Sequence, residues 1–419
     1  MRVLILGAGP AGLTAARTLR ELAPSRSIDP EITMVSAESC PPYSPPAMAD
    51  HFLTGREETL YWQGKDVCDR LRVDYRAGTA VEAVYPGQRQ VLLQNGSYLD
   101  YDRLIIATGS RLHAPLEGYD LPGVYNFKSL GAASLLVESV KAGETRSALI
   151  VGAGFIGVEV AVLLNELGCA VTIVDKLWVM PNILDEETAD LVLHDLQDRG
   201  IVVKQYTEAS CFTGGTRAEG IRLVNGEMLL ADACIAATGV KPNVSFLEGS
   251  GLDIGWGIRV DNRMRTNLPN IWAAGDVAET FDRMSGERYV HAIWPNATAQ
   301  GEVIAHDMLG FSVDYAGAER MNSMKHLGLP IMAVGDSTGS EVLRRRDGGK
   351  LRKIFLDDGR IVGFRLAGDI GGAGTYRALM LKGTDVSQYG EDLLDPRFRI
   401  SPNVGVGPAH LPVFQAISG

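Results

Sequence analysis

The chain is poor in cysteine, with five in 419 residues, at positions 40, 68, 169, 211 and 234. No two of them have the spacing of a redox dithiol, a zinc site or a local iron–sulfur binding run, which excludes those sites. Few, scattered cysteines in a large chain are typical of a reducing compartment. No apolar run reaches the roughly 20 residues of a transmembrane helix, and no cleavage pattern follows the apolar N-terminus. We therefore expect a cytoplasmic protein with no membrane span.

Positive charge is also scarce. The 40 lysines and arginines are outnumbered by 51 acids, for a net charge of −11. This argues against a nucleic-acid partner, because such binding needs a basic face. One segment has the opposite charge to the rest of the chain: residues 344–353 contain six basic residues and one acid. The seven histidines form no cluster with ligand spacing, and we expect no metal site.

Glycine, in contrast, is abundant, with 48 residues, and it occurs twice in the pattern G-x-G-x-x-G. Each pattern lies between a short apolar run and a helix-like stretch, as in a βαβ unit. A dinucleotide pyrophosphate needs backbone N–H groups at close range and a helix N-terminus behind them. The candidate residues are Gly7, Gly9, Pro10, Ala11 and Gly12, and then Gly152, Gly154 and Gly157. Together the two units predict an internal duplication.

A second pair of repeats supports this duplication. One apolar run ends in Ala107, Thr108 and Gly109, and another ends in Ala237, Thr238 and Gly239. Each run is preceded by a stretch with an Asn-Gly turn, which is typical of a β-meander. The fold class is therefore α/β, with two Rossmann-like dinucleotide-binding domains.

An acid at the end of the second strand of each unit would bind ribose hydroxyls. Asp175 follows an apolar run after Gly157, and a carboxylate there favours NADH over NADPH, although Lys176 beside it weakens the inference. In the first unit Ser36 stands at the usual acidic position, and Glu38 is the nearest carboxylate. Glu38 is either the ribose-binding residue or a solvated loop acid.

These motifs, together with Ala274-Gly275-Asp276 and the stretch WPNATAQG at residues 294–301, resemble the FAD/NAD-dependent pyridine-nucleotide oxidoreductases. The similar branches are ferredoxin and rubredoxin reductases, nitrite reductase FAD domains, coenzyme A disulfide reductases and NADH oxidases. The resemblance implies an FAD-binding domain from residues 1–112 and 242–312. It implies an NAD-binding domain from residues 113–241 and a C-terminal α+β interface domain from residues 313–419, with a terminal arm. Both Rossmann-like domains would be of the three-layer ββα type.

The resemblance also implies further contacts with the two cofactors, FAD and NAD(H). Asp276 would bind the ribityl chain or pyrophosphate of FAD, and Asn296 would open a helix aimed at the flavin. Phe155 and Ile156 would lie over the nicotinamide, or pack between helix and sheet. The other residues assigned to the cofactors by resemblance are Val81, Gly275, Trp294 and Ala297.

Three positions carry the catalytic expectations. Glu159 matches an acid that the family places near the nicotinamide. Pro46 stands where the disulfide-reductase and oxidase branch has its redox cysteine, so disulfide and sulfenate chemistry lose their nucleophile. Asp50 stands where ferredoxin reductases have a lysine, and it either faces the flavin or caps a helix.

Three functions remain open. The first is an FAD-dependent NAD(P)H oxidoreductase that exchanges electrons with a ferredoxin or an iron–sulfur subunit of a larger complex, and the basic segment 344–353 would steer an acidic partner. The second is a reductase of a small molecule such as oxygen, a quinone or a coenzyme A derivative. The third is a non-catalytic, NADH-responsive FAD scaffold. The C-terminal domain would mediate a homodimer or docking onto such a complex.

Overall fold

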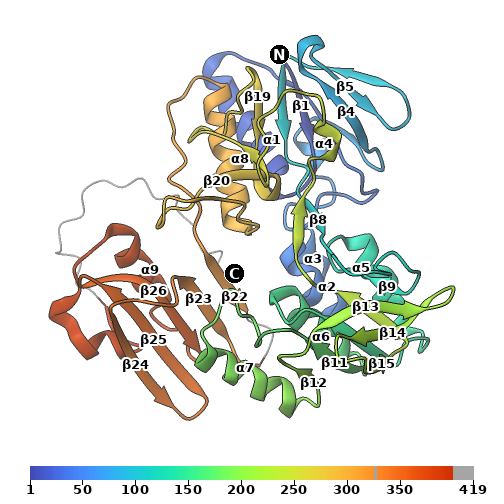
Figure 1. Ribbon diagram of the computed structural model, residues 1–419. Helices are drawn as coiled ribbons and strands as arrows, with labels where there is room; N and C mark the ends of the chain where they lie inside the picture. The colour runs from blue at the N-terminus through green and yellow to red at the C-terminus, as the bar shows by residue number, and fades with distance from the viewer. Residues whose placement is uncertain (325–327, 400–419) are drawn as a thin grey trace. The chain divides into compact units, whose positions relative to one another are not determined.

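The computed structural model describes residues 1–324 and 328–399, and the chain divides into two compact units, Met1–Leu329 and the part from Pro330 onward. Figure 1 shows the elements of both. The domain boundaries expected from the resemblance, including the one after residue 312, stay predictions. Most of the expected terminal arm, from residue 400 on, lies outside the described residues.

The first unit begins with a parallel five-stranded sheet in the order β19-β7-β1-β2-β3. Its central strand, β1, is apolar and buried from Val3 to Leu6, as expected of a parallel strand that is covered on both faces. The strands are β1 (Arg2–Leu6), β2 (Glu31–Val35), β3 (Val73–Arg76), β7 (Arg103–Ile106) and β19 (Ile271–Ala273). Two helices, α1 (Pro10–Leu22) and α8 (Trp294–Met308), pack closely. A Cβ at Gly301 of α8 would lie 2.4 Å from the carbonyl oxygen of Ala11.

A second parallel sheet in the same unit has the order β12-β11-β10-β16-β9. Its strands are β9 (Val124–Tyr125), β10 (Ser147–Val151), β11 (Ala170–Val174), β12 (Val202–Lys204) and β16 (Ala233–Ala236). Its helices are α5 (Leu130–Lys141), α6 (Phe155–Glu166) and α7 (Glu186–Asp198). The predicted duplication is thus confirmed, because β10, α6, β11 and β16 repeat the arrangement of β1, α1, β2 and β7.

Each sheet is accompanied by a three-stranded antiparallel meander, as the Asn-Gly turns predicted. The meander strands are β4 (Val81–Tyr85), β5 (Gln90–Leu93) and β6 (Tyr98–Asp100), and then β13 (Ala209–Gly214), β14 (Ala218–Leu223) and β15 (Met228–Leu230). The chain passes between the two halves through the antiparallel pair β8 (Ser110–Leu112) and β17 (Val240–Pro242). Three short helices follow β2: α2 (Met48–Thr54), α3 (Glu57–Leu60) and α4 (Val67–Arg70).

The second unit contains an antiparallel sheet in which β23, β26, β25 and β24 follow one another. These strands are β23 (Ile331–Gly335), β24 (Glu341–Asp347), β25 (Lys350–Asp357) and β26 (Arg360–Ala367), and α9 (Ala373–Lys382) packs on β26. The edge strand β24 is exposed along most of its length and carries Arg344, Arg345 and Arg346. The expected α+β character of the C-terminal part is therefore confirmed.

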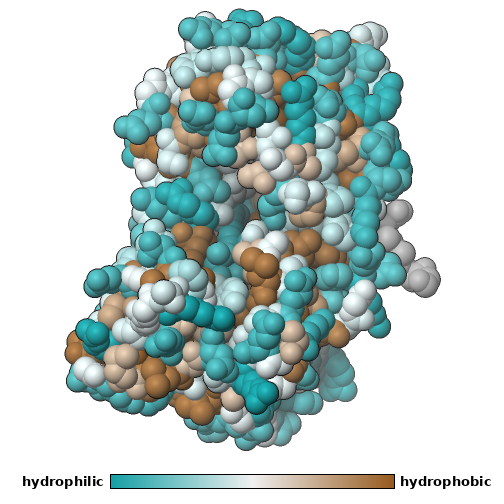
Figure 2. Space-filling model, turned by 90° about the vertical axis from the view of Figure 1, so that its right-hand side faces the viewer, coloured by the Kyte–Doolittle hydropathy of each residue, from teal (hydrophilic) through white to brown (hydrophobic). Residues whose placement is uncertain are grey.

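On the face shown in Figure 2, hydrophilic and hydrophobic residues are interspersed. Among the described residues, no helix is both long enough and apolar enough to cross a membrane.

Candidate cofactor-binding site

The turn between β1 and α1 is tightly constrained at two of its three motif glycines. Gly7 has a φ of +110°, and a Cβ there would lie 2.1 Å from the carbonyl oxygen of Ala107 on the neighbouring strand. A Cβ at Gly12 would lie 2.1 Å from the carbonyl oxygen of Gly7. A Cβ at Gly9 would meet no atom within 4 Å, so Gly9 leaves open space in front of the helix. No side chain caps the N-terminus of α1, and its first N–H groups are available to a phosphate.

The turn between β10 and α6 has the same geometry. Gly152 has a φ of +109°, a Cβ at Gly157 would lie 1.9 Å from the Gly152 oxygen, and Gly154 again faces open space. The N-cap residues Gly9 and Gly154 have nearly equal backbone angles, with φ of −72° and −70°. The duplication therefore reaches the level of individual dihedral angles, and both turns fit a dinucleotide phosphate.

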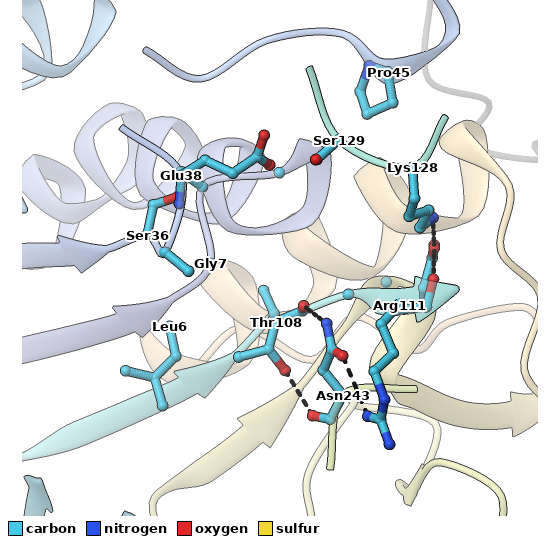
Figure 3. Close-up of a pocket in the computed structure, with 18 of the residues that line it drawn as sticks. Leu6, Gly7, Ser36, Glu38, Pro45, Thr108, Arg111, Lys128, Ser129 and Asn243 are labelled. Atoms are coloured by element: carbon cyan, nitrogen blue, oxygen red, sulfur yellow. Dashed lines mark hydrogen bonds and ion pairs between the residues drawn. The ribbon is translucent and has the colours of Figure 1, made fainter. Parts of the chain in front are cut away.

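A cavity of about 840 Å³ opens at the first turn (Figure 3). Its lining includes fourteen of the predicted site residues. They are Gly7, Gly9, Pro10, Ala11, Glu38, Pro46, Val81, Ala107, Thr108, Gly109, Gly275, Asp276, Trp294 and Ala297. These residues are far apart in the sequence. They come together because β1, β7 and β19 are neighbouring parallel strands, so that their carboxyl ends lie at the same edge of the sheet, beside the cavity.

Glu38 lies in the cavity wall, half-buried, and the Tyr43 hydroxyl donates to its carboxylate at 3.1 Å. Burial raises the pKa of Glu38, and the Tyr43 hydrogen bond opposes the rise. The Tyr43 hydroxyl also accepts a hydrogen bond from the N–H of Leu130, at the start of α5. The carboxylate of Glu38 is thus held in place by Tyr43 and is not freely solvated, and its contact with ribose hydroxyls stays a prediction.

Asp276 lies in the cavity wall, where it accepts hydrogen bonds from Ser110 at 2.7 Å and from the Lys128 ammonium at 2.9 Å. In Figure 3 the side chains of Arg111 and Lys128 lie on one side of the cavity and that of Glu38 on the other. Lys128 is ion-paired with Asp276, and Arg111 donates to the carbonyl oxygen of Pro242 at 3.2 Å. Neither was predicted, because no local motif marks a basic residue that lies in a cavity built by distant strands.

Asn243 is a further residue that the sequence did not reveal. Its amide donates to the carbonyl oxygen of Thr108 at 2.8 Å, and the Thr108 hydroxyl donates to the carbonyl oxygen of Asn243 at 3.1 Å. This reciprocal pair fixes the Ala-Thr-Gly turn to the returning chain. In the second half, the Thr238 hydroxyl donates to the carbonyl oxygen of His113 at 2.6 Å, which fixes Thr238 and Gly239 in the same way.

Three residues predicted at the first turn and the flavin do not line the cavity: Gly12, Asn296 and Asp50. The buried Asn296 side chain donates to the carbonyl oxygen of Glu319 at 3.0 Å and accepts from its N–H, so it holds a neighbouring loop. The helix itself begins at Trp294, two residues earlier than expected. Asp50 lies in the first turn of α2, which starts at Met48, and its carboxylate accepts from the Thr59 hydroxyl at 3.1 Å. The capping alternative placed the helix start near His51, and the structure corrects this.

The second glycine turn lies outside the cavity. Asp175 accepts hydrogen bonds from the N–H of Ala153 at 2.6 Å and of Leu177 at 2.8 Å, so it supports the turn at the end of β11. Phe155 and Ile156, the first residues of α6, are half-buried. These positions fit the adenosine and nicotinamide contacts expected of NADH, and the individual assignments stay predictions.

Glu159 lies on α6, which packs against α2. Burial alone raises the pKa of its carboxyl to about 7. The acid therefore titrates near neutral pH, which marks it as a candidate functional residue.

Pro45 and Pro46 line the cavity, and so does Cys40. Burial and the nearby Glu38 raise the pKa of the Cys40 thiol to about 11. At pH 7 only about one Cys40 in ten thousand is then a thiolate. Cys40 is therefore a poor nucleophile despite its position.

The comparisons with known proteins agree with the fold. The model of the pyridine nucleotide-disulphide oxidoreductases matches residues 1–301. The chain is 31% identical over 398 residues to the epsilon subunit of NADH-dependent phenylglyoxylate dehydrogenase from Aromatoleum evansii, covering 92% of this chain and 93% of the relative. It is 30% identical over 320 residues to the ferredoxin–NAD(+) reductase component of 3-phenylpropionate/cinnamic acid dioxygenase from Photorhabdus laumondii, covering 75% of this chain and 79% of the relative.

Among solved structures, the covalent putidaredoxin reductase–putidaredoxin complex has the same fold, with a TM-score of 0.84 at 22% identity, covering 94% of this chain and 97% of the other. The fold, the two glycine turns and the family match are mutually consistent. The chain therefore belongs to the pyridine nucleotide-disulphide oxidoreductase family, the FAD- and NAD(H)-dependent oxidoreductases expected from its two glycine turns.

Proposed function

We propose that the chain exchanges electrons between NAD(H) and an iron–sulfur protein, as a reductase subunit of a larger oxidoreductase. The observation that carries the proposal is the absence of a reactive thiol from the described lining of the cavity. Pro46, which stands where the resemblance places a redox cysteine, lines the cavity, and Cys40 stays protonated. Electrons that enter the site must then leave to an acceptor outside the chain.

The relatives support a protein acceptor. One is named as a subunit of a dehydrogenase and matches this chain over nearly its full length, and another is named as a ferredoxin–NAD(+) reductase component. The multisubunit arrangement is proposed for this chain on that basis. A cytoplasmic location is also proposed, because all five cysteines are free.

The residues at the two turns would have separate roles. FAD, when bound, accepts two electrons together and can release them singly. The Gly7–Gly12 turn and the N-terminus of α1 would hold its diphosphate, with Arg111 and Lys128 as counter-charges. Glu38 would accept from ribose hydroxyls. The Gly152–Gly157 turn and Asp175 would orient NADH, and Glu159 would hold a proton beside the nicotinamide below about pH 7.

The test is the acceptor profile of the purified protein with its FAD. We expect NADH-dependent reduction of a [2Fe–2S] or a two-[4Fe–4S] ferredoxin, measured under argon by bleaching of the cluster absorbance, to be faster than reduction of oxygen or a quinone. Equal or faster turnover with oxygen or quinone would contradict the proposal and favour the small-molecule reductase. Isolation of the tagged chain from its own cells in tight association with an iron–sulfur oxidoreductase would support the subunit role.

A further inference from the structure

Two tryptophans connect the cofactor cavity with the outside of the first unit. Trp294, the first residue of α8, lines the cavity. The ring of Trp62 packs edge-on against it, with a centroid distance of 4.7 Å and an interplanar angle of 74°. Both indoles are half-buried, and Ala292 and Pro295, on either side of Trp294 in the chain, are exposed.

Trp62 packs against the hydrophobic core of the first unit. It lies in the turn after α3, and it shares a small pocket with Leu13, Thr14 and Arg17 of α1. The ring therefore has support on its inner side and a partly exposed outer side. Edge-to-face indoles pack with little freedom, so the two rings form a continuous, well-ordered path of atoms.

We propose that Trp62 and Trp294 form the electron-transfer contact between the cavity and an iron–sulfur partner, whose surface covers Trp62. This inference rests on the proposed function. Electron transfer weakens steeply across gaps and solvent, and a packed aromatic pair that starts at the cavity wall and ends at the surface removes such a gap. A partly exposed tryptophan next to a redox site is also the type of residue that dominates interface affinity.

The electron balance is simple. Each NADH that is oxidised to NAD⁺ and a proton supplies two electrons, and each oxidised cluster of the partner takes up one. Two encounters of partner with the Trp62 face therefore complete one turnover. The indoles are neither oxidised nor reduced in the net reaction.

The experiment compares Trp62→Ala and Trp62→Phe with a matched control, Trp256→Ala, in the FAD-loaded protein. Trp256 is 41% exposed and does not line the cavity. For Trp62→Ala we expect the KM for the ferredoxin that the wild type reduces to rise roughly 30-fold, as for a central interface aromatic. The NADH:ferricyanide activity and the FAD content of Trp62→Ala should stay unchanged. Trp62→Phe should restore most of the wild-type KM for ferredoxin, and Trp256→Ala should leave this KM unchanged.

A second readout is independent of turnover. A photo-crosslinking p-benzoylphenylalanine at position 62 should couple to the ferredoxin on illumination, and the same group at position 256 should not. Crosslinking at both positions or at neither would overturn the inference. So would an unchanged KM in Trp62→Ala, or a parallel loss of ferricyanide activity, which would mean that Trp62 only supports the cavity. If the wild type reduces neither ferredoxin, the proposed function itself fails.

Discussion

The carboxyl of Glu159 provides a prediction whose size follows from the structure. Its pKa is about 7 in the folded protein, against an ordinary value of 4.5, and the only cause is burial. Between these two values the folded chain keeps a proton that the unfolded chain has lost. The free energy of unfolding should therefore fall as pH rises from about 4.5 to about 7, and the loss stays above that pH.

The magnitude can be worked out for the variant Glu159→Gln, which has a neutral side chain of nearly the same shape. A shift of about 2.5 pKa units corresponds to about 3 kcal/mol, and partial exposure makes this an upper limit. Relative to the wild type, the free energy of unfolding of Glu159→Gln should therefore increase by up to about 2.5 kcal/mol between pH 5 and pH 8, because part of the full change falls below pH 5. Subtracting the free energy of unfolding of the wild type at each pH removes the contributions of the other titrating groups, which both proteins share.

The assay is urea unfolding followed by tryptophan fluorescence at several pH values between 5 and 8. The control is a glutamate substitution at an exposed position, Glu138→Gln on α5, measured at the same pH values. A pH-independent difference between Glu159→Gln and the wild type would refute the reasoning, because it would show that the Glu159 carboxyl is solvated in the folded protein.

The remaining predictions concern the two glycine turns. Gly12→Ala should lower the free energy of unfolding by about 1–3 kcal/mol, because its methyl group would lie 2.1 Å from a carbonyl oxygen. Gly9→Ala should change stability by about 1 kcal/mol or less yet weaken FAD binding roughly tenfold, since its methyl group fills the open space at the helix N-terminus. Urea unfolding and FAD titration of the apoprotein measure both, and equal FAD affinity for Gly9→Ala and wild type would contradict the assignment. Asp175→Ala should raise the KM for NADH roughly tenfold and reduce the preference over NADPH at unchanged FAD content, as measured by steady-state kinetics. An unaltered ratio of the two coenzymes would count against Asp175.

The fold could be predicted from the sequence because its main constraints are local. Gly7 and Gly12 are required by close backbone contacts, and such contacts leave glycines at fixed spacing. The apolar runs that precede each turn are buried parallel strands, as their composition indicates. The duplication followed from finding the same local pattern twice.

The parts of the site that could not be predicted are contacts between distant segments. Lys128 reaches Asp276 across 148 residues, and Asn243 reaches Thr108 across 135. Nothing near Lys128 distinguishes it from the other cations of the chain. At Asn296 the resemblance correctly indicated the N-terminal end of a helix. It did not indicate that the Asn296 side chain donates to the backbone carbonyl of Glu319.

The two glycine turns share their backbone geometry, so their different roles must come from what surrounds them. The first turn opens into a cavity closed by side chains from both halves of the duplication, including Glu38 and Asp276 from one half and Lys128 from the other. The second turn lies outside that cavity and is supported by Asp175 from its own sheet. A resident cofactor needs enclosure, because each enclosing contact slows its release, whereas a coenzyme that is exchanged at every turnover needs an accessible turn. The cross-contacts made by Lys128 and Tyr43 occur only at the first turn, and this difference supports the proposed binding of FAD there and of NADH at the second turn.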